Sequence, residues 1–544
     1  MDYDYIIVGA GSAGCVLANR LSAHPSMNIL LLEAGGKDGN PWIHVPVGYF
    51  KTMHNPDTDW CYRTDPNPGL NGRSLDWPRG KVLGGSSAIN GLLYVRGQRE
   101  DYDYWRQLGN KGWSYSEVLP YFRRSEDQER GADAFHGVGG PLAVSDMRTR
   151  RDVCDALIAA AGEVGIEPND DFNGARQEGA GYFQLTARNG RRCSAATAYL
   201  KPVRSRGNLT VQTRALAHRL LFRGDDPKRV TGVAFSVGRD RRQASVREGG
   251  EVILSAGSIG SPQLLQLSGI GPGALLRSLE IPVRRDLPGV GENLQDHLQV
   301  RSVYEVNVPT LNGEINSPLR RIAIGLHYVL FRRGPMAMGA SQVCIFCKTR
   351  PELATPDIQF HFQPLSADKP GLKMHEFSGI TMSVCQLRPE SRGRVAIRTP
   401  DPNAHPSIQP NYLATELDRS TVVEGIRMTR RLIRSAALSK YVLREHLPGV
   451  EAQSDEDLLE AARNISQTIY HPTSTCRMGG DPGAVVDSRL RVHGLTGLRV
   501  VDASAMPSIT SGNTNAPTIM MAEKASDLIQ EDSSCRHGLA DVRT

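Results

Sequence analysis

One pattern near the N-terminus restricts the fold of this chain more than any other. An apolar run, YIIV, is followed by the glycine-rich turn GAGSAG and by CVLANRLSA, where apolar residues recur at helical spacing. A second apolar run, NILLLE, comes shortly afterwards. We expect a strand, a tight turn and a helix over 5–23, and then a second buried strand that ends at Glu33.

The three glycines of this turn have the spacing of a dinucleotide-binding turn. Gly9 permits the tight turn, Gly11 lets the backbone approach a pyrophosphate, and Gly14 lets helix and strand pack closely. Glu33 is placed to accept a hydrogen bond from a ribose hydroxyl and to repel a ribose phosphate. The pattern predicts FAD or NAD without choosing between them. The neighbouring residues Ser12, Ala13 and Ala34 are included among the expected cofactor contacts.

Length and composition exclude several other classes of protein. At 544 residues the chain is long enough for more than one core. Its net charge of +6 is spread without a basic tract, so no nucleic-acid partner is expected. Nine cysteines without regular spacing favour reduced thiols and a cytoplasmic location. Cys344 and Cys347 lack a second pair nearby, so we expect two buried strand thiols and no metal site.

The sequence offers one candidate for membrane contact. It has no secretory signal pattern at the N-terminus and no apolar run of the roughly 20 residues that cross a bilayer. In 317–334, Ile322, Leu326, Val329 and Leu330 share one helical face, with arginines at both ends. A core-facing helix is the first interpretation, and peripheral membrane contact is the alternative.

The character of the sequence changes along the chain. Residues 36–80 are rich in proline, glycine and asparagine and predict a long excursion of loops. Runs at 208–222 and 229–237 predict paired strands, and 249–271 again predicts strand, glycine turn and helix. Short alternating runs and helical segments over 300–468 predict a second domain with an antiparallel sheet.

Two further motifs decide the family that the chain resembles. GKVLGGSSAINGLLYVRG at 80–97 and GSIGSPQLLQLSGIG at 257–271 resemble the two signature patterns of the glucose-methanol-choline (GMC) oxidoreductases. The resemblance covers nearly the whole chain, and it is strongest to the choline dehydrogenase-like and L-sorbose dehydrogenase-like branch. It implies FAD as the cofactor. It also implies an α/β fold, in which a Rossmann-like FAD-binding domain carries an inserted α+β substrate domain built on an antiparallel sheet.

The resemblance and the alternation of segments together predict the domain bounds. The FAD-binding domain is expected over 1–146, 197–298 and 470–530, and the substrate-binding domain over 147–196 and 299–469. The polar end, 531–544, is expected to be a disordered tail.

The resemblance also implies a set of cofactor contacts. Ile89 occupies the position where some family members attach the flavin to a histidine, and an aliphatic carbon cannot form that bond, so noncovalent FAD is expected. The implied contacts are Val82, Gly84, Gly85, Ser86, Asn90, Gly91 and Leu92, with Ala215 near the adenine and Asp502, Ala503, Ala516 and Thr518 on the far side of the flavin.

Catalysis is assigned to a histidine in the stretch TIYHPTSTCRMGG at 468–480. A neutral imidazole accepts a proton near physiological pH. The family's catalytic pair matches His471 as general base and Asn515 as the amide that holds the substrate oxygen. Tyr470 and His361 are candidate substrate contacts. Cys476 has no visible base of its own, so a thiol nucleophile is not expected.

These expectations describe an FAD-dependent dehydrogenase that oxidises a primary alcohol, such as a sugar or polyol, to an aldehyde. A quinone-type acceptor then takes the electrons. Two alternatives stay open: an oxidase that forms hydrogen peroxide, and a flavin-containing lyase or photodecarboxylase. The identity of the alcohol and the oligomeric state are not predicted.

Overall fold

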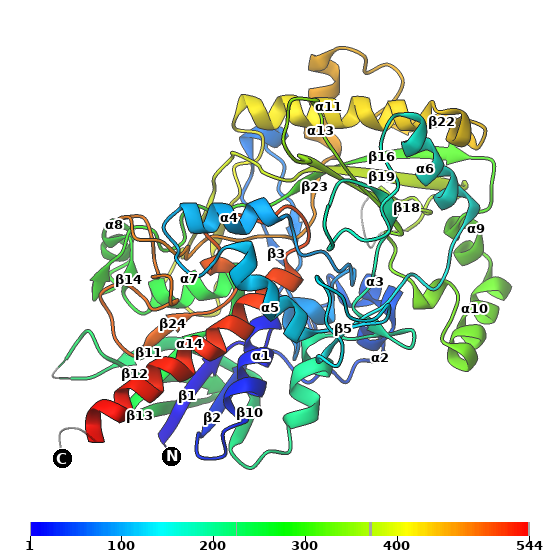
Figure 1. The fold of residues 1–544 in the computed structure, drawn as a ribbon. Helices are drawn as coiled ribbons and strands as arrows, with labels where there is room; N and C mark the ends of the chain where they lie inside the picture. The colour runs from blue at the N-terminus through cyan, green and yellow to red at the C-terminus, as the bar shows by residue number, and fades with distance from the viewer. Residues whose placement is uncertain (1, 225, 369–372, 542–544) are drawn as a thin grey trace.

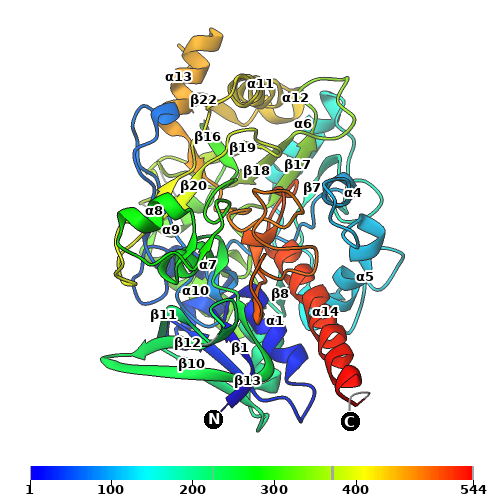
Figure 2. The same ribbon diagram turned by 90° about the vertical axis from the view of Figure 1, so that its left-hand side faces the viewer.

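A computed structural model describes residues 2–224, 226–368 and 373–541, with side chains up to residue 534. It contains two seven-stranded sheets, one above the other in Figures 1 and 2. The N-terminal strand belongs to the lower sheet, and helix α14 (Asn515–Asp541) runs beside α1 (Ser12–Leu21) in both views. The fold expectation of a nucleotide-binding sheet and a second, antiparallel sheet is confirmed.

The lower sheet combines a parallel centre with an antiparallel edge. Its order is β10-β2-β1-β13-β12-β11, and β24 pairs with β13. The parallel strands are β10 (Leu209–Thr213), β2 (Ile29–Glu33), β1 (Asp2–Val8), β24 (Leu498–Val500) and the C-terminal half of β13 (Asp240–Leu254). The runs at 208–222 and 229–237 are expected to pair, and they do so in part: β11 (Ala215–Phe222) pairs with β12 (Val230–Val237). The first part of the 208–222 run is a separate strand, β10, which pairs with β2.

The glycine turn packs as its spacing predicts. Gly9 has φ +102°, and a Cβ there would lie 2.5 Å from the Ser255 carbonyl oxygen. A Cβ on Gly14 would lie 1.9 Å from the Gly9 carbonyl oxygen. Only glycine therefore lets α1 start this close to β1.

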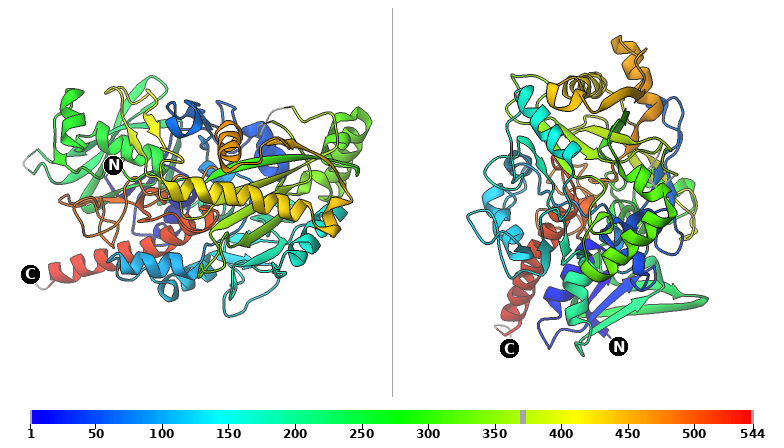
Figure 3. Two further views of the ribbon diagram at one scale, coloured as in Figure 1. Left: turned by 90° about the horizontal axis from the view of Figure 1, so that it is seen from above. Right: turned by 90° about the vertical axis from the view of Figure 1, so that its right-hand side faces the viewer.

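The upper sheet is antiparallel throughout, and its two faces differ in chemistry. Its order is β22-β16-β19-β18-β17-β7, with β23 beside β16. One face carries the apolar side chains of a core that α11 (Glu416–Ile433) covers, as Figures 1 and 3 show. The opposite face of the three central strands carries buried polar side chains, among them Gln299, Arg301, Gln359, His361 and Ser383. This polar face is what the upper sheet contributes to the site described below.

The strands of the upper sheet and the other helices have the following bounds. The upper sheet consists of β7 (Gly179–Tyr182), β16 (Leu298–Val306), β17 (Val343–Cys347), β18 (Ile358–Gln363), β19 (Gly379–Gln386), β22 (Val442–Leu447) and β23 (Gln467–Thr468). The longer helices are α4 (Arg99–Gln107), α5 (Tyr115–Ser125), α6 (Asp152–Glu163), α7 (Gly257–Leu267), α10 (Pro318–Phe331) and α13 (Asp455–Ile465). Short helices are α2 (Pro41–His44), α3 (Tyr49–Thr52), α8 (Gly273–Ser278), α9 (Leu311–Asn316) and α12 (Ala436–Ser439). The stretch over 36–80 consists mainly of such short elements and loops.

The first interpretation of the amphipathic segment at 317–334 is wrong. Helix α10 does not face the core: Leu319 is 80% exposed and Ile322 62% exposed, and Leu326, Val329 and Leu330 are also exposed. Only Tyr328 of this helix is buried. Figure 3 shows α10 on the outside of the molecule, in front of the body in its right-hand view. No helix in the described part of the chain is long and apolar enough to span a membrane.

Residues 531–541 of the expected disordered tail are helical and belong to α14. Two side chains past Gln530 form ion pairs with Arg489 and Arg499, and Arg499 lies on β24 of the lower sheet. Asp532 pairs with Arg499 at 2.6 Å and with Arg489 at 2.8 Å, and Glu531 pairs with Arg489 at 3.1 Å. Residues 542–544 of the predicted tail lie outside the described residues.

Candidate functional site

A cavity of about 730 Å³ is lined by residues of both sheets. It brings together most of the predicted site residues, although they come from distant parts of the chain. The predicted residues that line it are Gly9, Gly11, Ser12, Ala13, Glu33, Ala34, Gly85, Ser86, Asn90, Gly91, Leu92, Ala215, His361, Tyr470, His471, Asp502, Ala503, Asn515 and Thr518.

Four predicted residues lie behind the lining. Gly14 contacts the Gly9 carbonyl, as described above. The Gly84 N–H donates to the Ala10 carbonyl at 2.8 Å, Val82 is buried in a small apolar cluster with Ile89, and Ala516 is buried in the core beside the lower sheet. These four residues shape the wall of the cavity.

One end of the cavity has the shape that a phosphate group requires. Gly85 has φ +51°, and a Cβ on it would lie 2.7 Å from the Gly11 Cα, so two glycine-rich segments meet here. Helix α1 begins at Ser12, and no side chain caps its N-terminus. Its first backbone N–H groups and its dipole therefore favour an anion at this place.

Glu33, the predicted ribose contact, is the last residue of β2 and lines the cavity. Its carboxylate accepts hydrogen bonds from the Ala10 N–H at 2.9 Å and the Gly35 N–H at 2.8 Å. Burial raises the pKa of Glu33 to about 7, although these two N–H groups oppose the rise. The carboxyl group still lines the cavity and can take part in a further hydrogen bond.

Asp502 and Asn515 tie the catalytic end of the cavity to the cofactor cradle. Asp502 accepts from the Gly257 N–H at 2.9 Å and from the Ser261 hydroxyl at 2.6 Å. The Asn515 side-chain oxygen accepts from the Ser12 hydroxyl at 2.7 Å, which links the first residues of α14 and α1. The residue that contacts His471 is Asn513, whose side-chain Nδ2 lies 3.1 Å from His471 Nε2.

The turn that carries His471 is held from both sides. Asp296 accepts from the His471 N–H at 2.7 Å, from the Thr468 hydroxyl at 2.6 Å and from the Tyr412 hydroxyl. Arg79 donates to the Tyr470 carbonyl at 2.6 Å. Tyr470 has φ +70°, a strained conformation for a bulky residue, and strain of this kind is typical of functional turns.

The hydrogen bonds of His297 determine which nitrogen of His471 is free. His297 Nε2 lies 2.8 Å from the Leu387 carbonyl oxygen, and a carbonyl only accepts, so His297 Nε2 carries the hydrogen. In the neutral ring His297 Nδ1 is then an acceptor, and it lies 3.1 Å from His471 Nδ1, which donates to it. His471 Nε2 is left with its lone pair directed to Asn513. This tautomer is assigned from the hydrogen-bond pattern.

Burial keeps this histidine group uncharged. Burial lowers the pKa of His297 to about 4 and that of His361 to about 3. The pKa of His471 lies well below its usual value because the ring is buried and because His297, His361 and Arg79 disfavour a further positive charge. His361 stacks on Phe183, and its Nε2 has no hydrogen-bond partner within the described chain.

Other residues near His471 have structural roles. Thr473 and Ser474 are completely buried outside the cavity lining, so packing explains these two hydroxyl residues. Burial raises the pKa of the Cys476 thiol well above its usual value, which disfavours a nucleophile. Cys344 and Cys347 are buried free thiols on β17, as expected.

Sequence reasoning missed His297, Asp296 and Asn513. The first two are adjacent in ENLQDHLQV, a stretch that resembles the family without a role for either residue being evident. Asn513 is two residues from Asn515 in SGNTNAP, and only the direction of each side chain separates the two. The sequence did contain one signal for Asp296 and His297: two adjacent polar residues stand directly before a predicted apolar strand.

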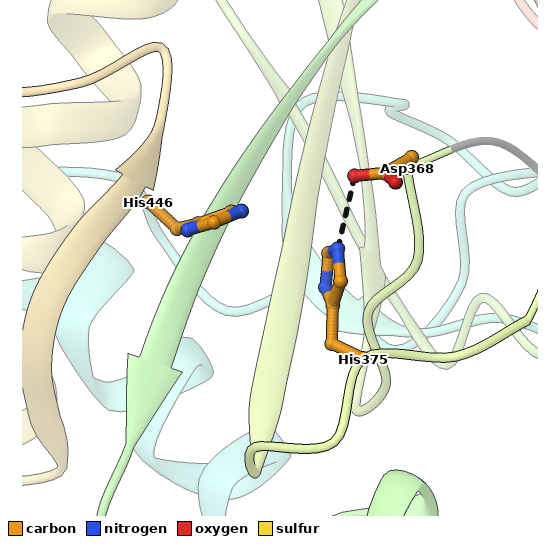
Figure 4. A group of neighbouring side chains, drawn as sticks. All are labelled: Asp368, His375 and His446. Carbon is orange, nitrogen blue, oxygen red and sulfur yellow. Dashed lines mark hydrogen bonds and ion pairs between the residues drawn. The ribbon is translucent and has the colours of Figure 1, made fainter.

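A second group of polar side chains lies outside the cavity lining (Figure 4). Ligand-type atoms of Asp368, His375 and His446 lie within 4.8 Å of one another. His375 Nε2 pairs with Asp368 at 3.0 Å, its Nδ1 lies 3.0 Å from the Ser366 hydroxyl, and its ring packs edge-on against His446. These contacts account for the group without a bound ion.

Known proteins resemble this chain over nearly its whole length. Family models described as GMC oxidoreductase match residues 3–299 and 389–522. The chain is 43% identical to alcohol dehydrogenase [acceptor] of Pseudomonas putida, over 97% of this chain and 95% of the relative. It is 43% identical to the mitochondrial choline dehydrogenase of Mus musculus, over 97% and 89%.

Solved structures agree with these sequence relatives. Pyridoxine 4-oxidase from Mesorbium loti superposes with a TM-score of 0.87 at 31% identity, covering 97% of this chain and 99% of the other. A formate oxidase superposes with a TM-score of 0.90 at 27% identity, covering 97% of this chain and 98% of the other. The family models, the relatives and the cavity together show that the chain belongs to the GMC oxidoreductases, a family of FAD-dependent enzymes.

Proposed function

We propose that this enzyme oxidises a primary alcohol to an aldehyde and passes the electrons to a quinone-type acceptor. The observation that carries the proposal is the neutral His471, whose Nε2 lone pair lies in the same cavity as the glycine cradle. The P. putida relative is named for alcohol oxidation with an unspecified acceptor, which supports the same reaction here.

The chain's own residues fit FAD at the cradle. Gly9, Gly11 and the start of α1 would hold the pyrophosphate, and Glu33 would meet the adenosine ribose. FAD supplies the acceptor for the hydride that leaves the alcohol carbon. Ile89 lines the cavity and offers no nucleophilic atom, which supports noncovalent binding.

The protein's part is to move and hold the hydroxyl proton. His471 Nε2 accepts it after the substrate hydroxyl replaces the Asn513 amide. The low pKa keeps the ring unprotonated beforehand, and negative charge that develops on the substrate oxygen stabilises the imidazolium formed next to it. His297 Nδ1 accepts a hydrogen bond from His471 Nδ1 throughout. We assign the substrate oxygen to the amide of Asn515 in the same cavity.

Two other reactions are distinguished by their products. An alcohol oxidase would release hydrogen peroxide in step with aldehyde, and two of the structural relatives are named as oxidases. A flavin-containing lyase or photodecarboxylase would leave the flavin oxidised when alcohol is added without oxygen. Anaerobic bleaching of the flavin, followed by peroxide measurement in air, separates the three.

The first prediction concerns the base. His471→Ala should lower the rate of anaerobic flavin reduction by alcohol about 100-fold or more, because no other neutral imidazole reaches the same position. The purified variant should keep the absorbance of bound FAD. The exposed His24→Ala is the control and should behave as the parent protein does. Near-normal reduction by His471→Ala would remove this residue from the mechanism.

The second prediction concerns His297 as a positioning residue. A glutamine there can accept from His471 Nδ1 through its oxygen and donate to the Leu387 carbonyl, whereas leucine can do neither. His297→Leu should therefore slow flavin reduction about 10- to 100-fold, and His297→Gln should recover most of the loss. Stopped-flow absorbance measures both rates. Equal losses in the two variants would show that the ring serves only to fill space.

We also propose that α10 rests on an anionic membrane surface. Its exposed apolar face is flanked by Arg320, Arg321 and Arg333, which are exposed, and no acidic residue occurs between Glu314 and Glu352. None of these three arginines forms an ion pair with another described residue. Apolar burial and attraction to anionic lipid act together on such a helix. Arg321 also lines the cavity, so a lipid-soluble quinone would find the entrance on this side.

The third prediction tests this contact by vesicle flotation. The protein should float with anionic phosphatidylglycerol vesicles, less so with neutral phosphatidylcholine vesicles and less at high salt. The double variant Ile322→Glu/Leu326→Glu should stay unbound, while flavin reduction by alcohol is unchanged. Leu443 and Val450 are similarly exposed on another surface, so Leu443→Glu/Val450→Glu is the matched control. Failure of the parent protein to float, or equal loss in the control, would contradict the proposal.

A further inference from the structure

One buried charge in the cavity has no hydrogen-bond or ion-pair partner among the described residues. Arg301 is only 3% exposed and lines the cavity, and its Nε has no hydrogen-bond partner among the described residues. Three other arginines are equally buried, and each has partners: Arg96 pairs with Glu126, Arg499 pairs with Glu251 and Asp532, and Arg192 donates to backbone carbonyls and to Asn90. An unpaired buried guanidinium is costly, and such a cost is offset when a ligand supplies the missing anion.

Arg301 belongs to a row of unmatched polar groups that crosses the sheet. In the strand register it is opposite Ser383 of β19, and Ser383 is opposite His361 of β18. Directly paired residues of an antiparallel sheet share a face, so the three side chains lie on the same polar surface. The Ser383 hydroxyl and His361 Nε2 also lack partners in the described chain. Arg301 and His361 both line the cavity and are therefore available to the same ligand, whereas Ser383 lies between them behind the lining.

The charges around this row have one sign. The acidic residues that line the cavity are Glu33 and Asp502, and both accept hydrogen bonds at the cofactor side. The basic residues in the lining are Lys51, Arg79, Arg301, Arg321 and Lys373. Gln299, the nearest cavity residue to Arg301 on β16, is uncharged. The substrate end of the cavity therefore attracts an anion and repels a cation.

We propose that the substrate is an alcohol that also carries a carboxylate, and that Arg301 binds this carboxylate with His361 beside it. This inference rests on the proposed alcohol oxidation and names its substrate class. A guanidinium binds a carboxylate through two parallel hydrogen bonds, which fixes orientation as well as charge. The same site disfavours choline, a cation, although several relatives are named choline dehydrogenases.

The strand also sets the separation between the two ends of the substrate. His297 directly precedes β16, and Gln299 and Arg301 occupy alternate positions of that strand. At the rise of a strand, the four residues from His297 to Arg301 span about 13 Å. The hydroxyl end lies at His471, which contacts His297, and the carboxylate lies toward Arg301. The two groups are therefore several bonds apart in the substrate, so short 2-hydroxy acids fit less well than longer hydroxyalkanoates.

The experiment uses the FAD-loaded enzyme and substrates that differ in one group. Anaerobic flavin reduction is measured with 6-hydroxyhexanoate, 1-hexanol and choline, and binding of unreactive hexanoate is measured by the shift it causes in the flavin spectrum. The variants are Arg301→Gln and Arg301→Lys. Arg96→Gln, which removes an equally buried but paired arginine, is the matched control.

The parent enzyme should prefer 6-hydroxyhexanoate to 1-hexanol and choline by about tenfold or more. Arg301→Gln should lose about 10- to 100-fold toward 6-hydroxyhexanoate and hexanoate, while 1-hexanol is little affected. Its melting temperature without ligand should not fall, because no partner in the chain is lost. Arg301→Lys should recover part of the loss. Arg96→Gln should melt earlier and keep the preference.

Three results would overturn the inference: a preference for choline, equal losses toward charged and neutral alcohols in Arg301→Gln, or hexanoate binding that does not depend on Arg301. Failure of every alcohol to reduce the flavin would instead contradict the proposed function. In that case hexanoate binding still decides the present question. Binding that requires Arg301 supports a carboxylate site, and binding that does not require it contradicts one.

Discussion

The hydrogen bond from His297 Nε2 to the Leu387 carbonyl constrains the rest of the arrangement around His471. A carbonyl cannot donate, so this contact fixes the tautomer of His297 and, through it, that of His471. The hydrogen bond is favourable, because the imidazole is buried and a buried polar atom without a partner destabilises the fold. It leaves one nitrogen lone pair facing the cavity, and the proton chemistry proposed here depends on that lone pair.

The two adjacent residues Asp296 and His297 have different roles at the turn that carries His471. Asp296 holds the backbone and hydroxyl of the segment before the catalytic histidine, while His297 orients its ring. Burial raises the pKa of Asp296 to about 6, and three donors oppose that rise. The strained Tyr470 is tolerated because its neighbours on both sides are fixed. The position of the His471 imidazole and the tautomer of its ring are thus set by two residues that directly precede β16 of the upper sheet.

The sequence predicts the cofactor end of this site better than its substrate end. Gly9, Gly11, Glu33 and the 80–97 motif are contiguous patterns, and their geometry follows from one strand, turn and helix. Arg301 depends on the register of three strands that are far apart in the chain. The alternation in LQVRSVYEV would ordinarily indicate a strand with one solvent-exposed face. Here that polar face is buried against the cavity, which periodicity alone cannot reveal.

Helix α10 shows the converse difficulty. Its apolar stripe is what a core-facing helix carries, yet no element covers it in the described chain. Periodicity identifies a face that avoids water, but it does not identify what replaces the water. The absence of acidic residues over 315–351 is the additional signal, and it agrees with an anionic partner better than with a protein core.

The central claim concerns a single proton, and histidine ring ¹⁵N NMR observes it directly. Spectra of the ¹⁵N-histidine-labelled protein at neutral pH, assigned by comparison with single-histidine variants, report the protonation of each ring nitrogen. The account predicts a protonated Nδ1 and an unprotonated Nε2 for His471, with the reverse for His297. A protonated Nε2 on His471 would contradict it.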